Sequence, residues 1–235
     1  YLQNMNTKRP LITLIILLFA VCASAQYRIQ CEDTCSHIHG IDMSHYQGKV
    51  FWESVGDNHK MSYLYLKASE GSDNIDKRYQ DNIYLAKCYG LKVGSYHFYR
   101  PRRPQHEQLA NFRAQCRPED QDLIPMIDVE TKSGMPTQEF VDSLHEFLIM
   151  VEKEYKQKPL VYTGENFYNS YLVGELDGYK LMIARYSEKA PVLKDGRDVY
   201  AWQYTGKGSL DGVVGYVDKS RLMGRHSLRE IRFRK

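Results

Sequence analysis

The sequence predicts an α/β fold in which eight strands close into a β/α barrel. Short β-like runs alternate with helical segments along residues 38–220, and no repeat or long linker interrupts them. Alternation of this kind is typical of a parallel sheet covered by helices. Eight strands in one domain of this size indicate a closed barrel. The segments between the last three strands are short and rich in Gly and Asp, so we expect an irregular, TIM-like barrel with reduced helices in its C-terminal part.

Residues 1–25 are predicted to comprise a signal peptide and the few residues that precede it. Lys8 and Arg9 are followed by an almost wholly apolar run over residues 11–21, and Ala23-Ser-Ala25 has the small-x-small pattern of a cleavage site. The apolar run is too short for a comfortable membrane span. We therefore expect cleavage near Ala25/Gln26 and export, to the periplasm or beyond the cell. A short cysteine-containing extension, residues 26–37, would then precede the barrel.

Export would place four cysteines of the mature chain in an oxidising compartment, where disulfides persist. These are Cys31, Cys35, Cys88 and Cys116, which allow three pairings. We favour Cys31–Cys35 and Cys88–Cys116, because the latter two lie near the ends of successive predicted helices. The sequence contains no paired CxxC motif, so we expect no metal site.

The predicted strands are apolar runs of four to six residues, at 40–43, 62–67, 92–97, 123–128, 159–162, 180–185, 198–203 and 213–218. Three of the connecting segments place apolar residues at helical spacing. The first helix, 76–89, stops at Gly90, and the second covers 104–116. The third begins after Thr137, a good N-cap residue, and reaches Val151.

The last fifteen residues, 221–235, are predicted to form a basic C-terminal tail. They hold six bases and one acid, Glu230. A solvated extension is the favoured interpretation, and weak adhesion to an anionic wall or membrane surface is the alternative. Without this tail and the signal peptide, residues 26–220 carry 24 basic and 28 acidic residues. That balance provides no basic face for nucleic acid.

Polar side chains lie at or near the ends of nearly all the predicted strands. In β/α barrels the residues that do chemistry lie at the C-terminal mouth, each supplied by a different strand. Asp128 and Glu130 are two residues apart and therefore point to the same face of an extended strand. Two carboxylates at a strand mouth suit acid-catalysed cleavage of a glycosidic bond. Two solvated acids entering a loop would be the plain structural interpretation, but the polar ends of the other strands favour catalysis.

The chain resembles the lysozymes of glycoside hydrolase family 25, the Chalaropsis-type muramidases, over about residues 38–220. The resemblance rests on eight motifs in order: Gly40-Ile-Asp-Met-Ser-His-Tyr-Gln-Gly48, Leu66-Lys-Ala-Ser-Glu-Gly71, Val93-Gly-Ser-Tyr-His-Phe98, Pro125-Met-Ile-Asp-Val-Glu130, Pro159-Leu-Val-Tyr-Thr-Gly164, Ile183-Ala-Arg-Tyr186, Trp202-Gln-Tyr-Thr205 and Gly215-Tyr-Val-Asp218. It implies an irregular β/α barrel that cleaves the β-1,4 bond after N-acetylmuramic acid in peptidoglycan.

The resemblance also implies roles for individual residues. Glu130 matches the general acid, and Asp128 matches the residue that orients the substrate's 2-acetamido group for attack on the anomeric carbon. Asp42 and Asp218 match further acids of the pocket. The residues that match the sugar subsites are Tyr96, Tyr162, Arg185 and Gln203, and Glu70 is expected to have a supporting role. His45 and His97 lie within motifs, but we expect both to be structural.

These observations predict a muramidase that acts as a monomer on bacterial peptidoglycan without a cofactor. Two other functions stay open at this point. One is a catalytically silent, glycan-binding barrel, against which the intact Asp128/Glu130 pair argues. The other is a chitinase-like hydrolase, because such barrels also use DxE-type acids and acetamide assistance. Lys219-Ser220 departs from the family, which commonly has a pair ending in Asn after the position of Asp218.

Overall fold

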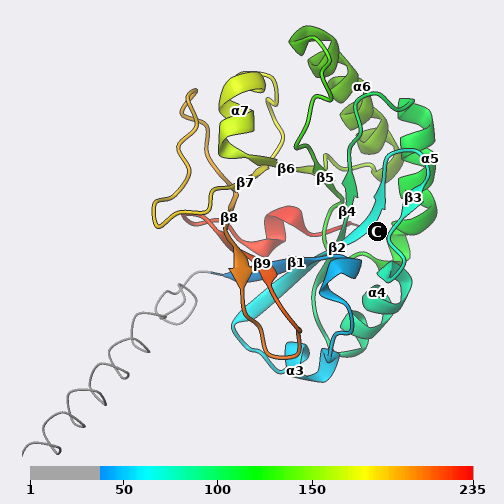
Figure 1. Cartoon of the computed structure of the whole chain (residues 1–235), viewed down its shortest axis with the longest axis vertical. Coiled ribbons are helices and arrows are strands. Elements are labelled where there is room, and N and C mark those ends of the chain that lie inside the picture. Colours follow the sequence, from blue (N-terminus) through cyan, green and yellow to red (C-terminus); the bar gives the residue numbers. More distant parts are fainter. Residues whose placement is uncertain (1–37, 235) are drawn as a thin grey trace, which may run out of the picture. The chain divides into compact units, whose positions relative to one another are not determined.

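A computed structural model describes residues 38–234 and confirms the predicted barrel (Figure 1). Eight strands pair in the order β1-β9-β8-β7-β6-β5-β4-β2, and β2 pairs again with β1 to close the ring. A two-residue strand, β3, pairs only with the end of β2. The strands are β1 (His39–Met43), β2 (Met61–Glu70), β3 (Asn74–Ile75), β4 (Val93–Phe98), β5 (Met126–Asp128), β6 (Leu160–Gly164), β7 (Leu181–Ala184), β8 (Ala201–Gly208) and β9 (Val217–Leu222).

All three predicted helices form between the strands of the first half. The helices are α3 (Trp52–Gly56), α4 (Tyr79–Cys88), α5 (Gln105–Gln115), α6 (Thr137–Tyr155) and α7 (Glu165–Tyr171), with short 3-10 helices η1 (His45–Gln47), η2 (Pro118–Asp120) and η3 (Leu228–Ile231). No helix connects β7 to β8 or β8 to β9 within the described residues, so the C-terminal part has the reduced helices that its Gly- and Asp-rich segments predict.

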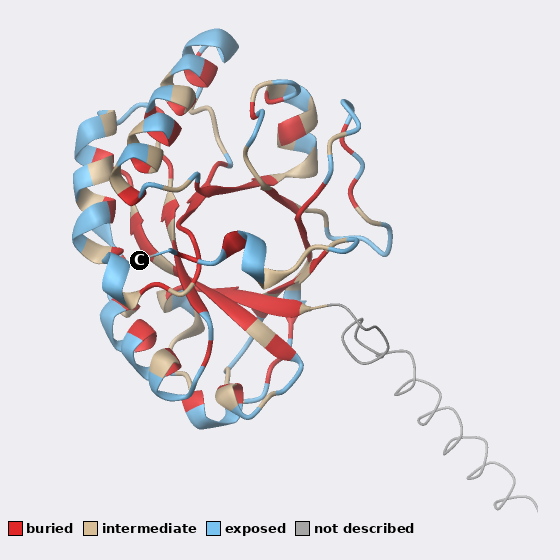
Figure 2. Ribbon diagram, turned by 180° about the vertical axis from the view of Figure 1, so that it is seen from behind, coloured by how far each residue is buried: buried red, intermediate tan, exposed pale blue. Residues whose placement is uncertain are grey.

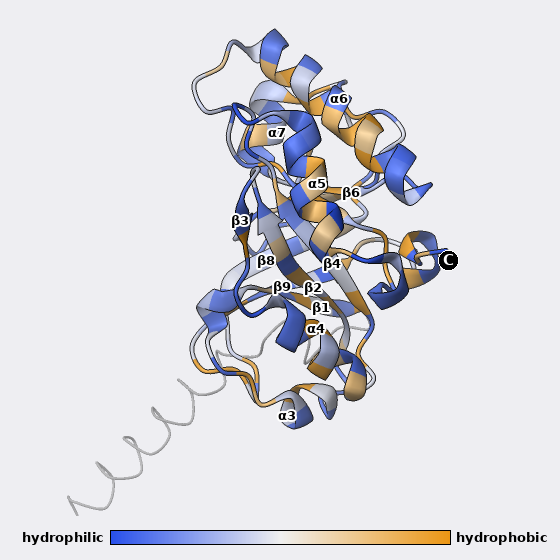
Figure 3. Cartoon of the chain, turned by 90° about the vertical axis from the view of Figure 1, so that its right-hand side faces the viewer, coloured by the Kyte–Doolittle hydropathy of each residue, from blue (hydrophilic) through white to orange (hydrophobic). Residues whose placement is uncertain are grey.

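The longest helix, α6, shows how the helices are attached to the barrel. Its buried residues recur at helical spacing along one face, and burying each large side chain contributes about 1.5–3 kcal/mol. Figure 3 shows hydrophobic and hydrophilic residues alternating along it. The helix begins one residue earlier than predicted in its capping pattern, since Pro136 occupies the N-cap position and Thr137 the first turn. The buried residues are Phe140, Val141, Leu144, Phe147, Leu148, Val151 and Tyr155.

Several tyrosines pack together in the interior of the barrel. Tyr63 and Tyr65 alternate with outward-facing leucines on β2 and are almost fully buried. Each ring lies over a glycine of a neighbouring strand. A Cβ atom at Gly40 would approach the Tyr63 ring to 2.2 Å, and one at Gly94 would approach the Tyr65 ring to 2.4 Å. These two glycines of the family motifs are therefore required by close packing.

The last strand, β9, corrects the expectation of a wholly parallel sheet. It runs antiparallel to both neighbours, β1 and β8, and begins four residues later than predicted. A parallel strand places its last residues at the C-terminal mouth, whereas an antiparallel strand places its first residues there. Asp218 is the second residue of β9 and pairs in register with Asp42 of β1. Because β9 is reversed, its first residues, among them Asp218, lie at the C-terminal mouth of the barrel.

The segment predicted as a basic tail is part of the folded domain, so the boundary drawn at residue 220 does not hold. Leu222 completes β9, and η3 lies across the N-terminal end of the barrel (Figure 2). Ile231 and Phe233 are buried, and main-chain hydrogen bonds join Ile124 to Ile231 and Phe233 to Asp122. The apolar residues spaced between the arginines explain the difference, because they cover the open bottom of the barrel.

The predicted disulfide between Cys88 and Cys116 is wrong, because both thiols are free. Cys88 is exposed at the end of α4. Cys116 is fully buried, and this burial raises the pKa of its thiol to about 12. The other predicted pair, Cys31–Cys35, and the predicted signal peptide lie outside the described residues. Within residues 38–234 no helix is long and apolar enough to cross a membrane.

Candidate active site

The candidate active site is a cavity of about 220 Å³ at the C-terminal ends of the barrel strands. All four predicted catalytic acids line it, together with three of the five predicted substrate-binding residues. The lining residues are Asp42, Met43, Ser44, Tyr46, Gln47, Lys67, Tyr96, Phe98, Met126, Asp128, Glu130, Tyr162, Gln203 and Asp218. Residues from both halves of the chain therefore meet in one acid-rich space.

Asp128 and Glu130 share this cavity but differ in exposure. Asp128, the last residue of β5, is only 7% exposed, and its Oδ1 atom has no hydrogen-bond partner within the described residues. Burial, followed by the negative charges of Glu130 and Asp42, raises the pKa of Asp128 well above its usual value. Glu130 lies exposed at the rim. Partial loss of hydration raises the pKa of Glu130 as well, against the opposing positive charges of Lys67 and Arg100.

Gln203 connects the acids to the tyrosines. Its Nε2 atom donates to both carboxylate oxygens of Asp42 at 3.1 Å. Its Oε1 atom accepts from the phenol of Tyr162 at 2.9 Å and from that of Tyr186 at 2.8 Å. These contacts use both ends of the amide, so Gln203 fixes its neighbours in the cavity wall and presents no free polar group to a ligand.

The acids of the cavity disfavour one another's ionisation. Burial raises the pKa of Asp42 well above its usual value, and the negative charge of Asp218 adds to this effect. Burial and the charge of Glu130 raise the pKa of Asp218 to about 6. A cavity with this many acids therefore keeps their carboxyl groups protonated up to a higher pH than in water, and the protonated carboxyl is the state that can donate a proton.

Glu70 and Arg185, two of the predicted substrate-binding residues, do not line this cavity. Burial disfavours the Glu70 carboxylate, but hydrogen bonds from Lys67, at 2.6 Å, and Arg100, at 2.9 Å from Nε, lower its pKa overall. The guanidinium of Arg185 pairs with both carboxylate oxygens of Glu165, at 2.6 and 2.8 Å. Glu70 thus holds the side chains of Lys67 and Arg100 in position. Arg185 forms its ion pair with the first residue of α7.

Sequence reasoning assigned no role to Lys67 or Phe98, which also line the cavity. The Lys67 ammonium lies 5.1 Å from the centre of the Phe98 ring. The positive charge of Lys67 lowers the pKa values of Asp128 and Glu130, opposing the effect of burial. The period of two could have identified both residues, because Lys67 follows Tyr65 on the inward face of β2 and Phe98 follows Tyr96 on β4.

The two motif histidines both contact polar side chains of the protein, which fits the structural role expected of them. The ring of His97 is fully buried between Ser69, whose Oγ lies 2.9 Å from Nδ1, and Gln108. Burial lowers the pKa of His97 to about 4, so the ring stays neutral. His45 lies with Nδ1 2.8 Å from the buried carboxylate of Asp76, which also accepts its main-chain N–H.

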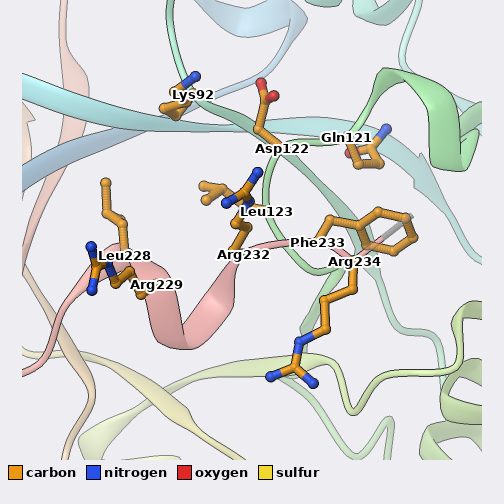
Figure 4. A pocket seen from close by; sticks show the side chains of 9 residues that line it. All are labelled: Lys92, Gln121, Asp122, Leu123, Leu228, Arg229, Arg232, Phe233 and Arg234. Carbon is orange, nitrogen blue, oxygen red and sulfur yellow. The ribbon is translucent and has the colours of Figure 1, made fainter.

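A larger cavity, about 920 Å³, lies at the other end of the barrel and contains no predicted site residue (Figure 4). It is formed where η3 and the last residues cover the starts of β4 and β5. Its lining residues are Lys92, Gln121, Asp122, Leu123, Leu228, Arg229, Arg232, Phe233 and Arg234. The smaller cavity is the candidate active site because four carboxyl groups with raised pKa values converge there. No group of three or more His, Cys, Asp or Glu residues within 38–234 is arranged to hold a metal ion.

Comparison with known proteins agrees with this geometry. Residues 41–213 match the family described as Glycosyl hydrolases family 25. The uncharacterised protein YegX of Escherichia coli K12 is 31% identical over 185 residues, which cover 77% of this chain and 68% of YegX. Lysozyme M1 of Streptomyces globisporus is 28% identical over 204 residues, which cover 80% of this chain and 69% of Lysozyme M1. The crystal structure of a lysozyme from Streptomyces coelicolor superimposes with a TM-score of 0.74 at 28% identity, covering 83% of this chain and 95% of that one.

Proposed function

This chain belongs to family 25 of the glycosyl hydrolases, and we propose that it hydrolyses the β-1,4 bond between N-acetylmuramic acid and N-acetylglucosamine in bacterial peptidoglycan. The family and its lysozyme relatives make the chain a glycoside hydrolase of the lysozyme type. The bond that is cut and the residues that cut it are part of the proposal. The observation that supports them most is the pairing of a buried, unpartnered Asp128 with an exposed Glu130 in one cavity.

In the proposed mechanism Glu130 is the general acid. It lies at the rim, where a polymeric substrate reaches it, and its raised pKa keeps a larger fraction of the carboxyl protonated. Protonation of the glycosidic oxygen lets the leaving sugar depart as an alcohol. Loss of such a group typically costs about 10²–10⁴ in rate. After departure the Glu130 carboxylate can accept a proton from the incoming water.

Asp128 acts on the substrate's 2-acetamido group. The acetamide N–H would donate to the unpartnered Oδ1 atom of Asp128, which stabilises the carboxylate form against the effect of burial. Held in this way, the acetamide carbonyl oxygen faces the anomeric carbon and can attack it as the bond to the leaving oxygen breaks. Such substrate assistance is a known exception to the use of a protein nucleophile. Tyr162, fixed by Gln203, and Tyr96 border the same space.

Mass spectrometry of the products from purified peptidoglycan tests this proposal directly. We expect fragments with N-acetylmuramic acid at the reducing end, and we expect Glu130→Gln to reduce their release by about 10³-fold while leaving the circular dichroism spectrum unchanged. Fragments ending in N-acetylglucosamine would contradict the assigned bond. Binding without release of reducing sugar would favour the silent glycan-binding barrel, and faster cleavage of chitin oligomers would favour the chitinase-like hydrolase.

Export is also part of the proposal, because peptidoglycan lies outside the cytoplasmic membrane. It rests on the basic, apolar and small-x-small pattern of residues 8–25. N-terminal sequencing of the protein recovered from outside the cytoplasm should give a chain that begins at Gln26. An uncleaved chain that stays in the cytoplasm would contradict this part alone.

A further inference from the structure

A second cavity, of about 320 Å³, opens beside the catalytic one, and its cations come from a single short connection. Arg100-Pro-Arg-Arg-Pro104 joins β4 to α5 and supplies three arginines. We call this cavity the arginine pocket. It is lined by Glu70, Gly71, Asp73, Asn74, Arg100, Arg102, Arg103 and Ser133.

The arginine pocket shares a wall with the catalytic cavity. Phe98 and Lys67 line the catalytic cavity, and the Arg100 guanidinium lies 4.4 Å from the centre of the Phe98 ring. Glu70 joins Lys67 to Arg100 across this wall. Ser133 lies three residues after Glu130, in the loop that follows β5. A substrate held at Glu130 therefore lies next to the arginines.

Not all of the pocket's charges are free. Arg100 is committed to Glu70. Arg102 donates from Nε to the carbonyl oxygen of Ser133 at 2.7 Å, which leaves the outer nitrogens of its guanidinium available. The side chain of Arg103 is exposed and makes no hydrogen bond or ion pair within the described residues. The one acid that remains uncompensated is Asp73, also exposed.

The main chain that carries these arginines is held in place by hydrogen bonds from a buried glutamine. Gln108, which is fully buried, donates from Nε2 to the carbonyl oxygens of Arg100 at 3.0 Å and Arg103 at 3.1 Å. Its Oε1 atom accepts the N–H of Arg100 at 2.9 Å. The two prolines restrict the loop further, because each fixes its own φ angle. The pocket is thus arranged before a ligand arrives, which reduces the entropy lost on binding.

We propose that the arginine pocket binds a carboxylate of the peptide attached to N-acetylmuramic acid. This inference rests on the proposed function. In peptidoglycan each muramic acid carries a short peptide with free carboxylates, whereas chitin carries none. The planar guanidinium fork matches a carboxylate with two parallel hydrogen bonds. Arg102 and Arg103 therefore select peptide-bearing glycan over unsubstituted glycan, and they act on substrate affinity.

The test compares three soluble substrates of equal glycan length. One carries intact peptides, one has had them removed by an amidase, and one has its peptide carboxylates converted to amides. The quantity measured is the ratio of kcat/KM for the peptide-bearing glycan to kcat/KM for each of the other two. Wild type should prefer the peptide-bearing glycan. Arg103→Gln should lower both ratios about threefold, and the Arg102→Gln/Arg103→Gln double variant about tenfold, mainly through KM.

Two further variants sharpen the comparison. Arg229→Gln removes an exposed arginine at the other end of the barrel and should leave both ratios at the wild-type value. Asp73→Asn removes the one negative charge that would repel the carboxylate, so it should raise the ratios. Equal ratios in wild type, Arg103→Gln and Arg229→Gln would overturn the assignment of the pocket. Failure of wild type to cleave any of the three glycans would instead overturn the proposed function and this assignment with it.

Discussion

Gln203 shows how one uncharged residue can set the state of several acids. A buried carboxylate without hydrogen bonds costs several kcal/mol, and the amide of Gln203 is what the Asp42 carboxylate faces. The same amide holds the Tyr162 phenol beside Asp128. The residue thus links a strand of the first half of the barrel to one of the second half. That Gln203 also contacts the sugar, as the resemblance implies, stays a prediction, and the contacts of its amide support a positioning role.

Gln203→Met should therefore damage both stability and activity. It keeps the length of the side chain but leaves Asp42 and Tyr162 without a partner. We expect the free energy of unfolding to fall by about 1–3 kcal/mol, as measured in urea, and kcat to fall about tenfold. Gln138→Met, which alters an exposed amide on α6, is the matched control and should change neither quantity. A wild-type kcat in Gln203→Met would contradict the positioning role.

Asp128→Asn should lower the activity of the enzyme and raise its stability near neutral pH. Without the carboxylate the acetamide is no longer held for attack, so we expect kcat to fall about 10²–10³-fold, by analogy with the loss of one preorganised transition-state contact. The folded state raises the pKa of Asp128, so ionisation of this group lowers stability as the pH rises above its unfolded value. The neutral Asn avoids that loss.

The measurement is urea unfolding of wild type and Asp128→Asn at pH 4 and pH 7.5, alongside hydrolysis of peptidoglycan. The variant should be the more stable protein at pH 7.5 and show little difference at pH 4. A variant that is less stable at both pH values would mean that Asp128 is held by contacts that the amide cannot replace.

At the scale of elements, the last residues of the chain act as a plug for the barrel. Phe233 is buried, lies edge-on to Tyr155 with ring centres 6.3 Å apart, and donates its N–H to the carbonyl of Asp122. Arg234 next to it is exposed. Alternation of this kind across Ile231, Arg232, Phe233 and Arg234 is the pattern of a segment with one buried face.

Phe233→Ala should lower the free energy of unfolding by about 3–5 kcal/mol, since it removes a buried aromatic ring and leaves a cavity. Arg234→Ala should change it by less than about 0.5 kcal/mol, as for an exposed substitution without special contacts. Chemical denaturation followed by tryptophan fluorescence measures both. Equal, negligible effects would restore the interpretation of a solvated tail.

The plug and β9 also show what the sequence could predict and what it could not. The eight strands and three main helices follow from local apolar patterns, and Asp128 and Glu130 share a cavity because the strand period of two is a local property. The direction of β9 depends on which neighbours a short strand pairs with, and no local pattern encodes that. The prediction of a basic tail likewise considered only the charges of this segment and overlooked Ile231 and Phe233, which are buried between the arginines. The ion pair of Arg185 could not be predicted, because its partner, Glu165, lies on a short helix that the patterns did not reveal.

At the scale of the whole molecule, the acids at the mouth of the barrel repel one another when they are ionised. Four acids face one another in one cavity, and the pKa values of all four are raised. Each such acid binds its proton more tightly in the folded than in the unfolded chain. By linkage, the folded state is favoured at low pH and loses this advantage as the pH rises. The arrangement needed for proton donation therefore makes the barrel less stable near neutral pH than its core alone would.

Asp218→Asn tests this conflict, because the pKa of Asp218 is raised from 3.8 to about 6. Its contribution to stability is fully present below pH 3.8 and is lost as the pH rises through about 6. We expect the variant to match wild type at pH 3.5 and to exceed it by about 1–2 kcal/mol at pH 7.5, allowing for partial exposure to solvent. The activity of the variant should begin to fall at a lower pH, because the charge that favours a protonated Glu130 is gone. Urea unfolding and initial rates across this pH range measure both effects, with Asp211→Asn, an exposed acid outside the cavity, as the control. A variant whose stability and rate profiles both coincide with those of wild type would show that Asp218 and Glu130 do not interact.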